Sequence, residues 1–249
     1  MTLLAILLAT LAGGLLSVLL AGSLALTVLH RHADHLVSFA VGALLAAAFL
    51  GMLPHAQEAG LSPGQTGGWV LIGLLAFFLL EKAALWRHNH GEGAGNCALQ
   101  AAVPMVVIGD GLHNFVDGVA IAAAFLADTH LGIATAAAIL LHEIPQELAD
   151  FMVLLAAGLD RRRALLLNLL SGTSMIAGGV LGYFLLGNAQ SALPVVLALA
   201  AASFIYIAIS DLVPHLQRQY GLRNGLAQVL LIGMGASALL LGEMLSHAH

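Results

Sequence analysis

The chain has 249 residues, of which 60% are hydrophobic and only 8% carry a charge, and its mean hydropathy is +0.98. About a quarter of the residues of a soluble domain are charged, so this composition excludes a soluble globular protein and predicts an integral membrane protein. The formal net charge of -5 says less than where the charges lie. The single cysteine, Cys97, excludes an intramolecular disulfide and a metal site built from thiolates.

Apolar stretches long enough to cross a bilayer recur along the whole chain. A membrane-spanning helix needs about 20 apolar residues. The predicted spans are 3–29, 36–53, 69–86, 101–127, 131–156, 164–186, 193–213 and 226–245. The first is longer than the apolar core of a signal peptide and lacks a positively charged start. We therefore expect an all-α integral membrane protein, one domain over residues 1–249, with a longer connection at 87–100.

The basic residues all fall near alternate connections, those after the first, third, fifth and seventh spans. They are Arg31, Lys82, Arg87, Arg161, Arg162, Arg163, Arg218 and Arg223. Connections rich in Lys and Arg stay in the cytoplasm, so eight spans place all of them inside and both termini outside. We expect a multi-pass protein of a prokaryotic inner (plasma) membrane, with the 87–100 loop in the cytoplasm.

The second and seventh spans end on related sequences, 52–57 and 212–217, which share Pro-His at 54–55 and 214–215. These spans run in opposite directions, which is typical of the inverted repeats of transporters. Coincidence in a Leu-rich chain is the alternative reading of so short a match. We interpret the chain as eight transmembrane helices in a 3+2+3 arrangement. The first three and the last three helices form an inverted repeat, which flanks a central hairpin of the fourth and fifth helices.

The fourth and fifth spans contain carboxylates but no basic residue between Ala101 and Ala156. The carboxylates are Asp110, Asp117, Glu143, Glu147 and Asp150. A charge at membrane depth is costly and marks an ion or proton pathway. The missing counter-charge is most simply a metal cation.

Two motifs in these spans predict one metal site. They are His-Asn-Phe-Val-Asp-Gly at 113–118 and His-Glu-Ile-Pro-Gln-Glu at 142–147. The short connection near Asp128 makes the two spans an antiparallel hairpin. His113 then lies level with Gln146, and Asp117 with His142, while residues four apart share a helix face. Imidazole and carboxylate ligands suit a divalent transition metal.

Pro145 adds a local feature to the fifth span. Because proline has no backbone N–H, it leaves the carbonyl of Leu141 without its helical partner. We expect a bend at the site and an additional oxygen there.

These motifs, together with Glu81-Lys82 at the end of the third span, resemble the ZIP (Zrt-, Irt-like protein) family of divalent metal transporters. The resemblance implies import of divalent metal, mainly zinc, into the cytosol through a site on spans 4 and 5. It also implies a lipid-embedded protein without a catalytic cofactor, and a homodimer. The ligands it implies are His113, Asn114, Asp117, His142, Glu143 and Gln146.

The chain departs from the family pattern at two places. Gln146 stands where many relatives of this subtype have a second histidine, so affinity or metal preference is expected to differ. Members with a two-metal centre have Glu-Pro on the sixth span after Ser-Gly, but here Ser171-Gly172 is followed by Thr-Ser-Met-Ile. This puts a second metal in doubt.

Other polar residues are candidates for the metal pathway. His55, Glu58 and His130 are expected at the outer face, and Asp211 and His215 at the inner end of the seventh span. Asp110, Glu147 and Asp150 extend the carboxylate series of the two motif spans. For the outer residues the alternative is ordinary solvated loop positions, and for the carboxylates it is hydrogen bonding between helices.

An intramembrane zinc protease is the competing function. His142-Glu143 begins like an HExxH motif, in which two histidines hold zinc and the glutamate is the base. Gln146 replaces the second histidine and Pro145 interrupts the helix. Since no P-loop, dinucleotide fingerprint or nucleic-acid-binding patch is found, the sequence favours gradient-driven transport of zinc, iron, manganese or cadmium, with no nucleic-acid partner.

Overall fold

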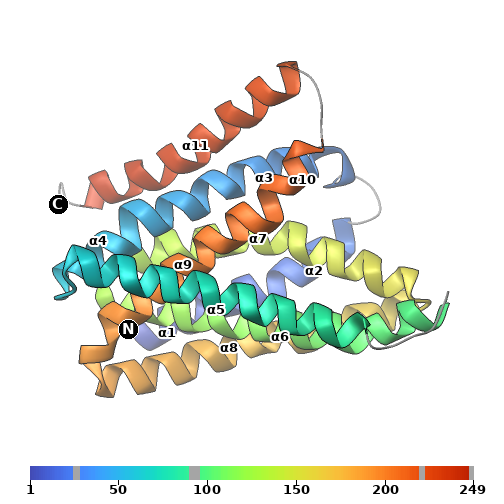
Figure 1. Ribbon diagram of the computed structural model, residues 1–249, viewed down its shortest axis with the longest axis horizontal. Coiled ribbons are helices and arrows are strands. Elements are labelled where there is room, and N and C mark those ends of the chain that lie inside the picture. Colours follow the sequence, from blue (N-terminus) through green and yellow to red (C-terminus); the bar gives the residue numbers. More distant parts are fainter. Residues whose placement is uncertain (25–28, 90–95, 219–221, 247–249) are drawn as a thin grey trace.

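A computed structural model describes residues 1–24, 29–89, 96–218 and 222–246, and these residues form helices and no strands. Figure 1 shows a bundle of long helices running along one common direction. The elements are α1 (Thr2–Leu11), η1 (Ala12–Leu16), α2 (Ser17–Leu24), α3 (Leu29–Ala46), η2 (Ala47–Met52), α4 (Leu53–Glu58), α5 (Pro63–Asn89), α6 (Asn96–Ala127), α7 (Thr129–Ala156), α8 (Arg161–Asn188), η3 (Gln190–Ala192), α9 (Leu193–Ile207), η4 (Ala208–Leu212), α10 (Val213–Gln217) and α11 (Leu222–Ser246).

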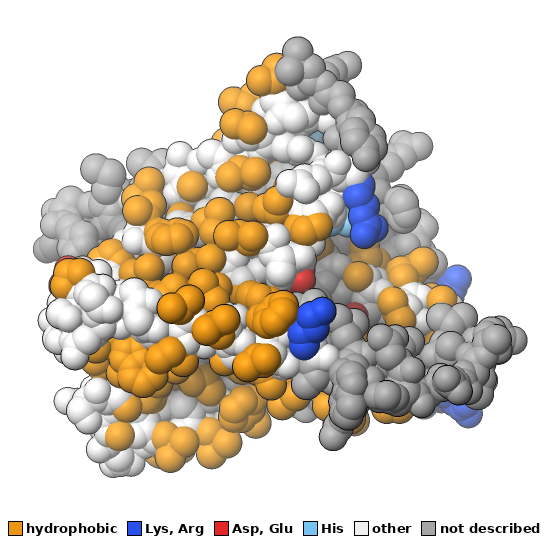
Figure 2. All heavy atoms as spheres, viewed as in Figure 1, with side chains coloured by type: hydrophobic (Ala, Val, Ile, Leu, Met, Phe, Trp, Pro, Cys, Tyr) orange, Lys and Arg blue, Asp and Glu red, His pale blue; other side chains and the backbone are white. Residues whose placement is uncertain are grey.

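The prediction of an all-α membrane protein is confirmed. Large apolar side chains cover the outside of the bundle, and Figure 2 shows them as a broad surface, with the Lys and Arg side chains toward one end. Among the described residues, six helical stretches are long and apolar enough to cross a membrane. α7, with its three carboxylates, and α11, apolar over Asn224–Ala238, are not among the six. The count of eight crossings therefore stays a prediction.

The helices α5 and α6 extend into the predicted 87–100 connection, whose place outside the membrane stays a prediction. α5 continues to Asn89 and α6 already begins at Asn96, so only residues 90–95 are left between them, and these lie outside the described residues. The physical reason is that hydropathy marks where a helix leaves the bilayer, not where it ends. Good helix formers such as Ala and Leu on both sides of the gap let the two helices continue beyond their apolar parts.

The two Pro-His segments have the same local structure. In each, a π-helical stretch, η2 or η4, directly precedes the short helix that contains Pro54 or Pro214. Proline removes one backbone donor from the helical ladder, and a π-bulge is a common local adjustment in helices, frequently at functional sites. The continuous helical segment from α3 through η2 to α4 and the one from α9 through η4 to α10 run in opposite directions in Figure 1. The two segments contact each other. This arrangement agrees with an inverted relationship between them.

Glycines let the helices around the hairpin pack with their backbones in contact. A Cβ on Gly118 of α6 would collide with the carbonyl oxygen of Met175 on α8, and one on Gly178 of α8 with that of Phe115 on α6. Gly14 of η1 meets Gly172 of α8 in the same way. Small residues at such crossings are typical of membrane helices, whose association depends on close packing. α8 therefore fixes the position of α6.

Gly178→Ala is expected to destabilise the protein by about 1–3 kcal/mol, because the added methyl group forces the α6 and α8 backbones apart. Gly187→Ala on the same helix is the matched control, since it points into open space and should leave stability unchanged or slightly higher. Thermal unfolding of both purified variants in detergent measures the difference. Equal unfolding temperatures would show that this crossing is not tightly packed.

Candidate metal centre

The hairpin that carries both motifs is closed by a one-residue turn at Asp128. Its carboxylate accepts hydrogen bonds from the backbone N–H groups of His130 at 2.8 Å and Leu131 at 2.9 Å, which caps α7. Partial burial acts to raise the pKa of Asp128, but these two donors outweigh it, so the pKa lies below its ordinary value. The cap is therefore ionised at neutral pH, where it favours the helix N-terminus.

Four side chains of the two motifs converge inside the bundle. His113 and Asp117 of α6 and His142 and Glu143 of α7 each offer one ligand atom, and these atoms all lie within 4.8 Å of one another. His142 Nε2 is 3.2 Å from Asp117 Oδ2 and 3.5 Å from Glu143 Oε1. His113 Nε2 is 3.4 Å from Glu143 Oε1 and 3.3 Å from His142 Nε2. We call this set the histidine group.

The carboxylates of the histidine group lack ordinary partners. Asp117 and Glu143 are fully buried, and none of their carboxylate oxygens accepts a hydrogen bond among the described residues. Burying an ionised carboxylate without compensation is very costly. Two nitrogen and two oxygen atoms around one point match the four-coordinate preference of Zn²⁺. The arrangement can therefore hold a divalent metal.

Neighbouring groups orient the His142 ring. Its Nδ1 lies 3.2 Å from the carbonyl oxygen of Ala138 one turn earlier, which directs Nε2 toward the other ligand atoms. Phe204 of α9 packs against the ring, with centroids 6.3 Å apart. Partners of this kind fix the tautomer and orientation of metal-binding histidines. Sequence reasoning missed Phe204, because no periodic pattern says which residue of another helix faces the site.

Asn114 and Gln146, the two amide residues expected as ligands, are not members of the histidine group. Asn114 is fully buried, and its Nδ2 donates to Asp110 Oδ1 at 2.9 Å and to the Asp110 carbonyl at 3.2 Å. Asn114 is thus directed at Asp110, one turn away on the same helix. Gln146 is half-buried on α7, and its role as a ligand stays a prediction.

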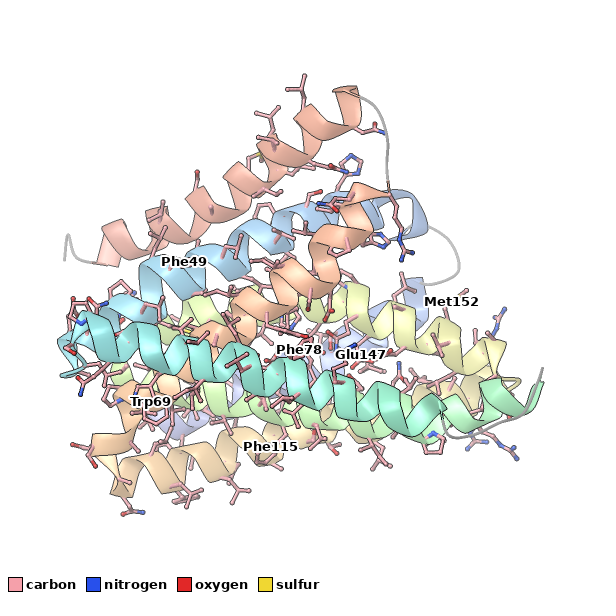
Figure 3. The ribbon with its side chains drawn as sticks, viewed as in Figure 1. Phe49, Trp69, Phe78, Phe115, Glu147 and Met152 are labelled. Carbon is pink, nitrogen blue, oxygen red and sulfur yellow. The ribbon has the colours of Figure 1, made fainter. Side chains whose placement is uncertain are left out.

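A second group of carboxylates lies beside the first and shares Glu143. Asp110, Glu143 and Glu147 are all buried, and one oxygen of each lies within 4.8 Å of the others. We call this set the carboxylate group. Figure 3 shows Glu147 on α7 inside the bundle. Asp150, the remaining carboxylate of the series, is half-buried one turn further along α7.

The other pathway candidates lie outside both groups. His55 is partly buried, and with Glu58 it lines a cavity of about 400 Å³ near the end of α6. His55 Nδ1 lies 3.0 Å from the Gly51 carbonyl oxygen. His130 is exposed near the α7 cap, and Asp211 and His215 are exposed on η4 and α10. The structure therefore does not bring these residues into the metal centre.

These features define a polytopic helical membrane protein whose central hairpin contains a buried group of potential metal ligands. The sequence model of the family described as "ZIP Zinc transporter" matches residues 1–104 and 86–242. The chain is similar to zinc transporter ZIP13 of Pongo abelii, with 36% identity over 228 residues, 84% of this chain and 66% of that protein. It is 31% identical to ZIP13 of Danio rerio over 264 residues, 82% of this chain and 75% of that protein.

Zinc transporter foi of Drosophila melanogaster is 39% identical over 144 residues, 57% of this chain and 20% of that protein. The chain thus spans about two thirds of the Pongo abelii relative and a fifth of the fly relative. With the match over most of its length, the chain belongs to the ZIP zinc transporter family. The family consists of transporters rather than enzymes, so the protease alternative has no support.

Gln146→His should tighten zinc binding and slow release, because imidazole is a stronger ligand than a neutral amide. Gln146→Leu keeps the size of the side chain but removes both polar atoms, and it should weaken binding. Zinc titration of the purified proteins by calorimetry measures both effects. Affinities equal to that of the unchanged chain in both variants would show that Gln146 does not contact the metal.

Proposed function

We propose that this chain carries a divalent transition metal, with zinc preferred and iron, manganese or cadmium as further substrates, across the membrane into the cytosol. The observation that carries the proposal is the histidine group: two imidazoles and two uncompensated carboxylates converge on one point inside a membrane bundle. Membership of a zinc transporter family supports this choice of substrate.

The proposed ligands are His113, Asp117, His142 and Glu143, with Asn114 and Gln146 completing the set. His113 is 18% exposed, whereas Asp117, His142 and Glu143 are fully buried. An ion could therefore reach the site past His113 and leave it only after the helices move. We propose that the α6–α7 hairpin, together with α8, which packs closely on α6, moves against the other helices, so that the site opens to one side at a time. Because metal binds the neutral imidazoles, loading releases any protons they carry.

The remaining polar residues are proposed as transient cation-binding positions along the transport pathway, on either side of the histidine group. His55, Glu58 and His130 lie toward the Asp128 end of the hairpin, where they could attract cations before entry. Asp110, Glu147 and Asp150 continue from the site in the opposite direction, and Asp211 and His215 are proposed as partners for the departing ion.

The orientation follows from charge. Helix α1 begins and α11 ends toward the same end of the bundle in Figure 1, and Lys and Arg side chains lie toward the other end in Figure 2. The positive-inside rule then places both termini outside. We propose a multi-pass protein of a prokaryotic inner membrane that acts as a homodimer. Exposed apolar side chains on α5 and α11 offer a surface on which a second copy of the chain could pack.

His142→Ala is expected to abolish zinc uptake, because it removes a fully buried ligand from the centre of the histidine group. His35→Ala, which changes an exposed histidine of α3, is the matched control and should keep normal uptake. Uptake of a radioactive zinc isotope into proteoliposomes measures both. Normal uptake by His142→Ala protein that elutes as a single folded species would contradict the proposal.

A further inference from the structure

We propose that three consecutive arginines at the start of α8, Arg161, Arg162 and Arg163, bind the phosphate group of an anionic phospholipid. The acyl chains of this lipid lie along the side of α8 that faces the membrane. We call the three residues the arginine turn. None of them belongs to the histidine group, and the inference goes beyond the transport of metal proposed above.

The arginine turn concentrates positive charge at one place. It holds three of the eight basic residues of the chain, and all three side chains are exposed. Arg161 and Arg162 form no ion pair among the described residues. Arg163 Nε lies 3.4 Å from Asp160 Oδ2, but these side chains are 78% and 60% exposed. Since exposed pairs contribute little, the turn keeps a net positive charge that is free to meet an anion.

The arginines do not stabilise the helix that carries them. The N-terminus of a helix has a partial positive charge, which favours acidic residues and disfavours basic ones. Asp160 already caps α8, because its Oδ1 accepts a hydrogen bond from the backbone N–H of Arg163 at 2.9 Å. Three arginines in the first turn oppose the helix dipole, which indicates a role outside the helix.

The backbone of the arginine turn is fixed on both sides. α7 ends at Gly158, whose φ of +90° lies in the left-handed region, and the backbone N–H of Leu159 donates to the Leu154 carbonyl oxygen at 3.2 Å. Directly after the arginines, Ala164 is fully buried in an apolar cluster with Leu154 and Phe151 of α7. A ligand that binds to a fixed backbone loses less free energy to ordering the protein.

The arginine turn also lies at the boundary of a membrane span. The stretch Arg161–Asn188 is long and apolar enough to cross a membrane, and the arginines are its first residues. Leu166 and Leu170 follow Arg162 at intervals of four residues and are 55% and 62% exposed. Residues four apart share a helix face. A positive group therefore continues into an exposed apolar surface, which matches the headgroup and the acyl chains of a phospholipid.

The choice of arginine favours phosphate over a general attraction. The chain has seven arginines and one lysine, although lysine would orient a membrane helix equally well. The planar guanidinium group donates two parallel hydrogen bonds to a phosphate and is less strongly hydrated than an ammonium group. Anionic lipids of the cytoplasmic leaflet attract basic segments next to membrane helices. The occupant is thus an anionic phospholipid rather than a neutral one.

A lipid at this position acts on the helix that holds the hairpin. α8 packs against α6 through Gly178, and its Ser171 hydroxyl donates to Asp110 Oδ2. The lipid phosphate would set how deep the start of α8 lies in the membrane, and these contacts would pass that depth on to α6.

The site is tested by native mass spectrometry of the purified full-length chain, titrated with phosphatidylglycerol and with phosphatidylcholine of the same acyl chains. We expect tighter binding of phosphatidylglycerol. A variant with Arg161→Gln, Arg162→Gln and Arg163→Gln should lose this preference. Because each basic residue near an anionic lipid strengthens binding about fivefold, the triple variant should bind phosphatidylglycerol roughly a hundredfold more weakly.

Two single variants provide a matched comparison. Arg162→Gln should weaken phosphatidylglycerol binding about fivefold, whereas Arg218→Gln, which removes an exposed arginine just after α10, should leave it unchanged. The glutamine variants of the arginine turn should unfold at the same or a slightly higher temperature, because they relieve the conflict with the helix dipole. Loss of lipid binding is then not loss of folding.

Three results would overturn the proposal. The first is equal binding of the two lipids by the unchanged chain, and the second is a preference for phosphatidylglycerol that persists in the triple variant. The third is binding of glycerol phosphate, which lacks acyl chains, as tightly as phosphatidylglycerol, because the site would then recognise a free phosphate rather than a lipid.

Discussion

The structure depends on negative charges that are buried in a membrane hairpin without basic residues to balance them. Asp117 and Glu143 are fully enclosed and accept no hydrogen bonds among the described residues, although the imidazoles of His113 and His142 lie close to both. In an apolar surrounding such an arrangement is costly unless a cation completes it. The same cost explains why the site favours a bound metal, because it is most stable when occupied. Release of the metal then requires the proposed movement of the helices.

The rest of the fold holds this hairpin in position. α8 packs on α6 so closely that Gly118 and Gly178 leave no room for a Cβ, and it brings Ser171 against Asp110. From the other side, α9 places Phe204 on the His142 ring. The rods that contain α3 and α9 each have a π-helical stretch before a Pro-His pair, which makes them suitable places for bending. A tightly packed contact on one side and adjustable helices on the other suit a transporter that moves its site between two openings.

The sequence was most informative where neighbouring helices are joined by a short turn. The Asp128 connection makes the hairpin register predictable, and His142 does lie against Asp117. Hydropathy did not show how far α5 and α6 extend into the 87–100 connection, since helices continue beyond the bilayer. It also gave no sign of the π-helical stretches, which depend on backbone register rather than on side-chain type. Contacts from distant helices, such as Ser171 with Asp110, could not be predicted, because periodicity shows which face of a helix is buried but not what covers it.

The central claim, that two imidazoles and two carboxylates hold one metal ion inside the hairpin, is tested most directly by X-ray absorption at the zinc edge. The purified chain would be loaded with a single equivalent of zinc. The account predicts a mixed first shell of nitrogen and oxygen at about 2.0–2.2 Å, with the outer-shell scattering of two imidazole rings. A shell without imidazole scattering, or one of six oxygens, would contradict it.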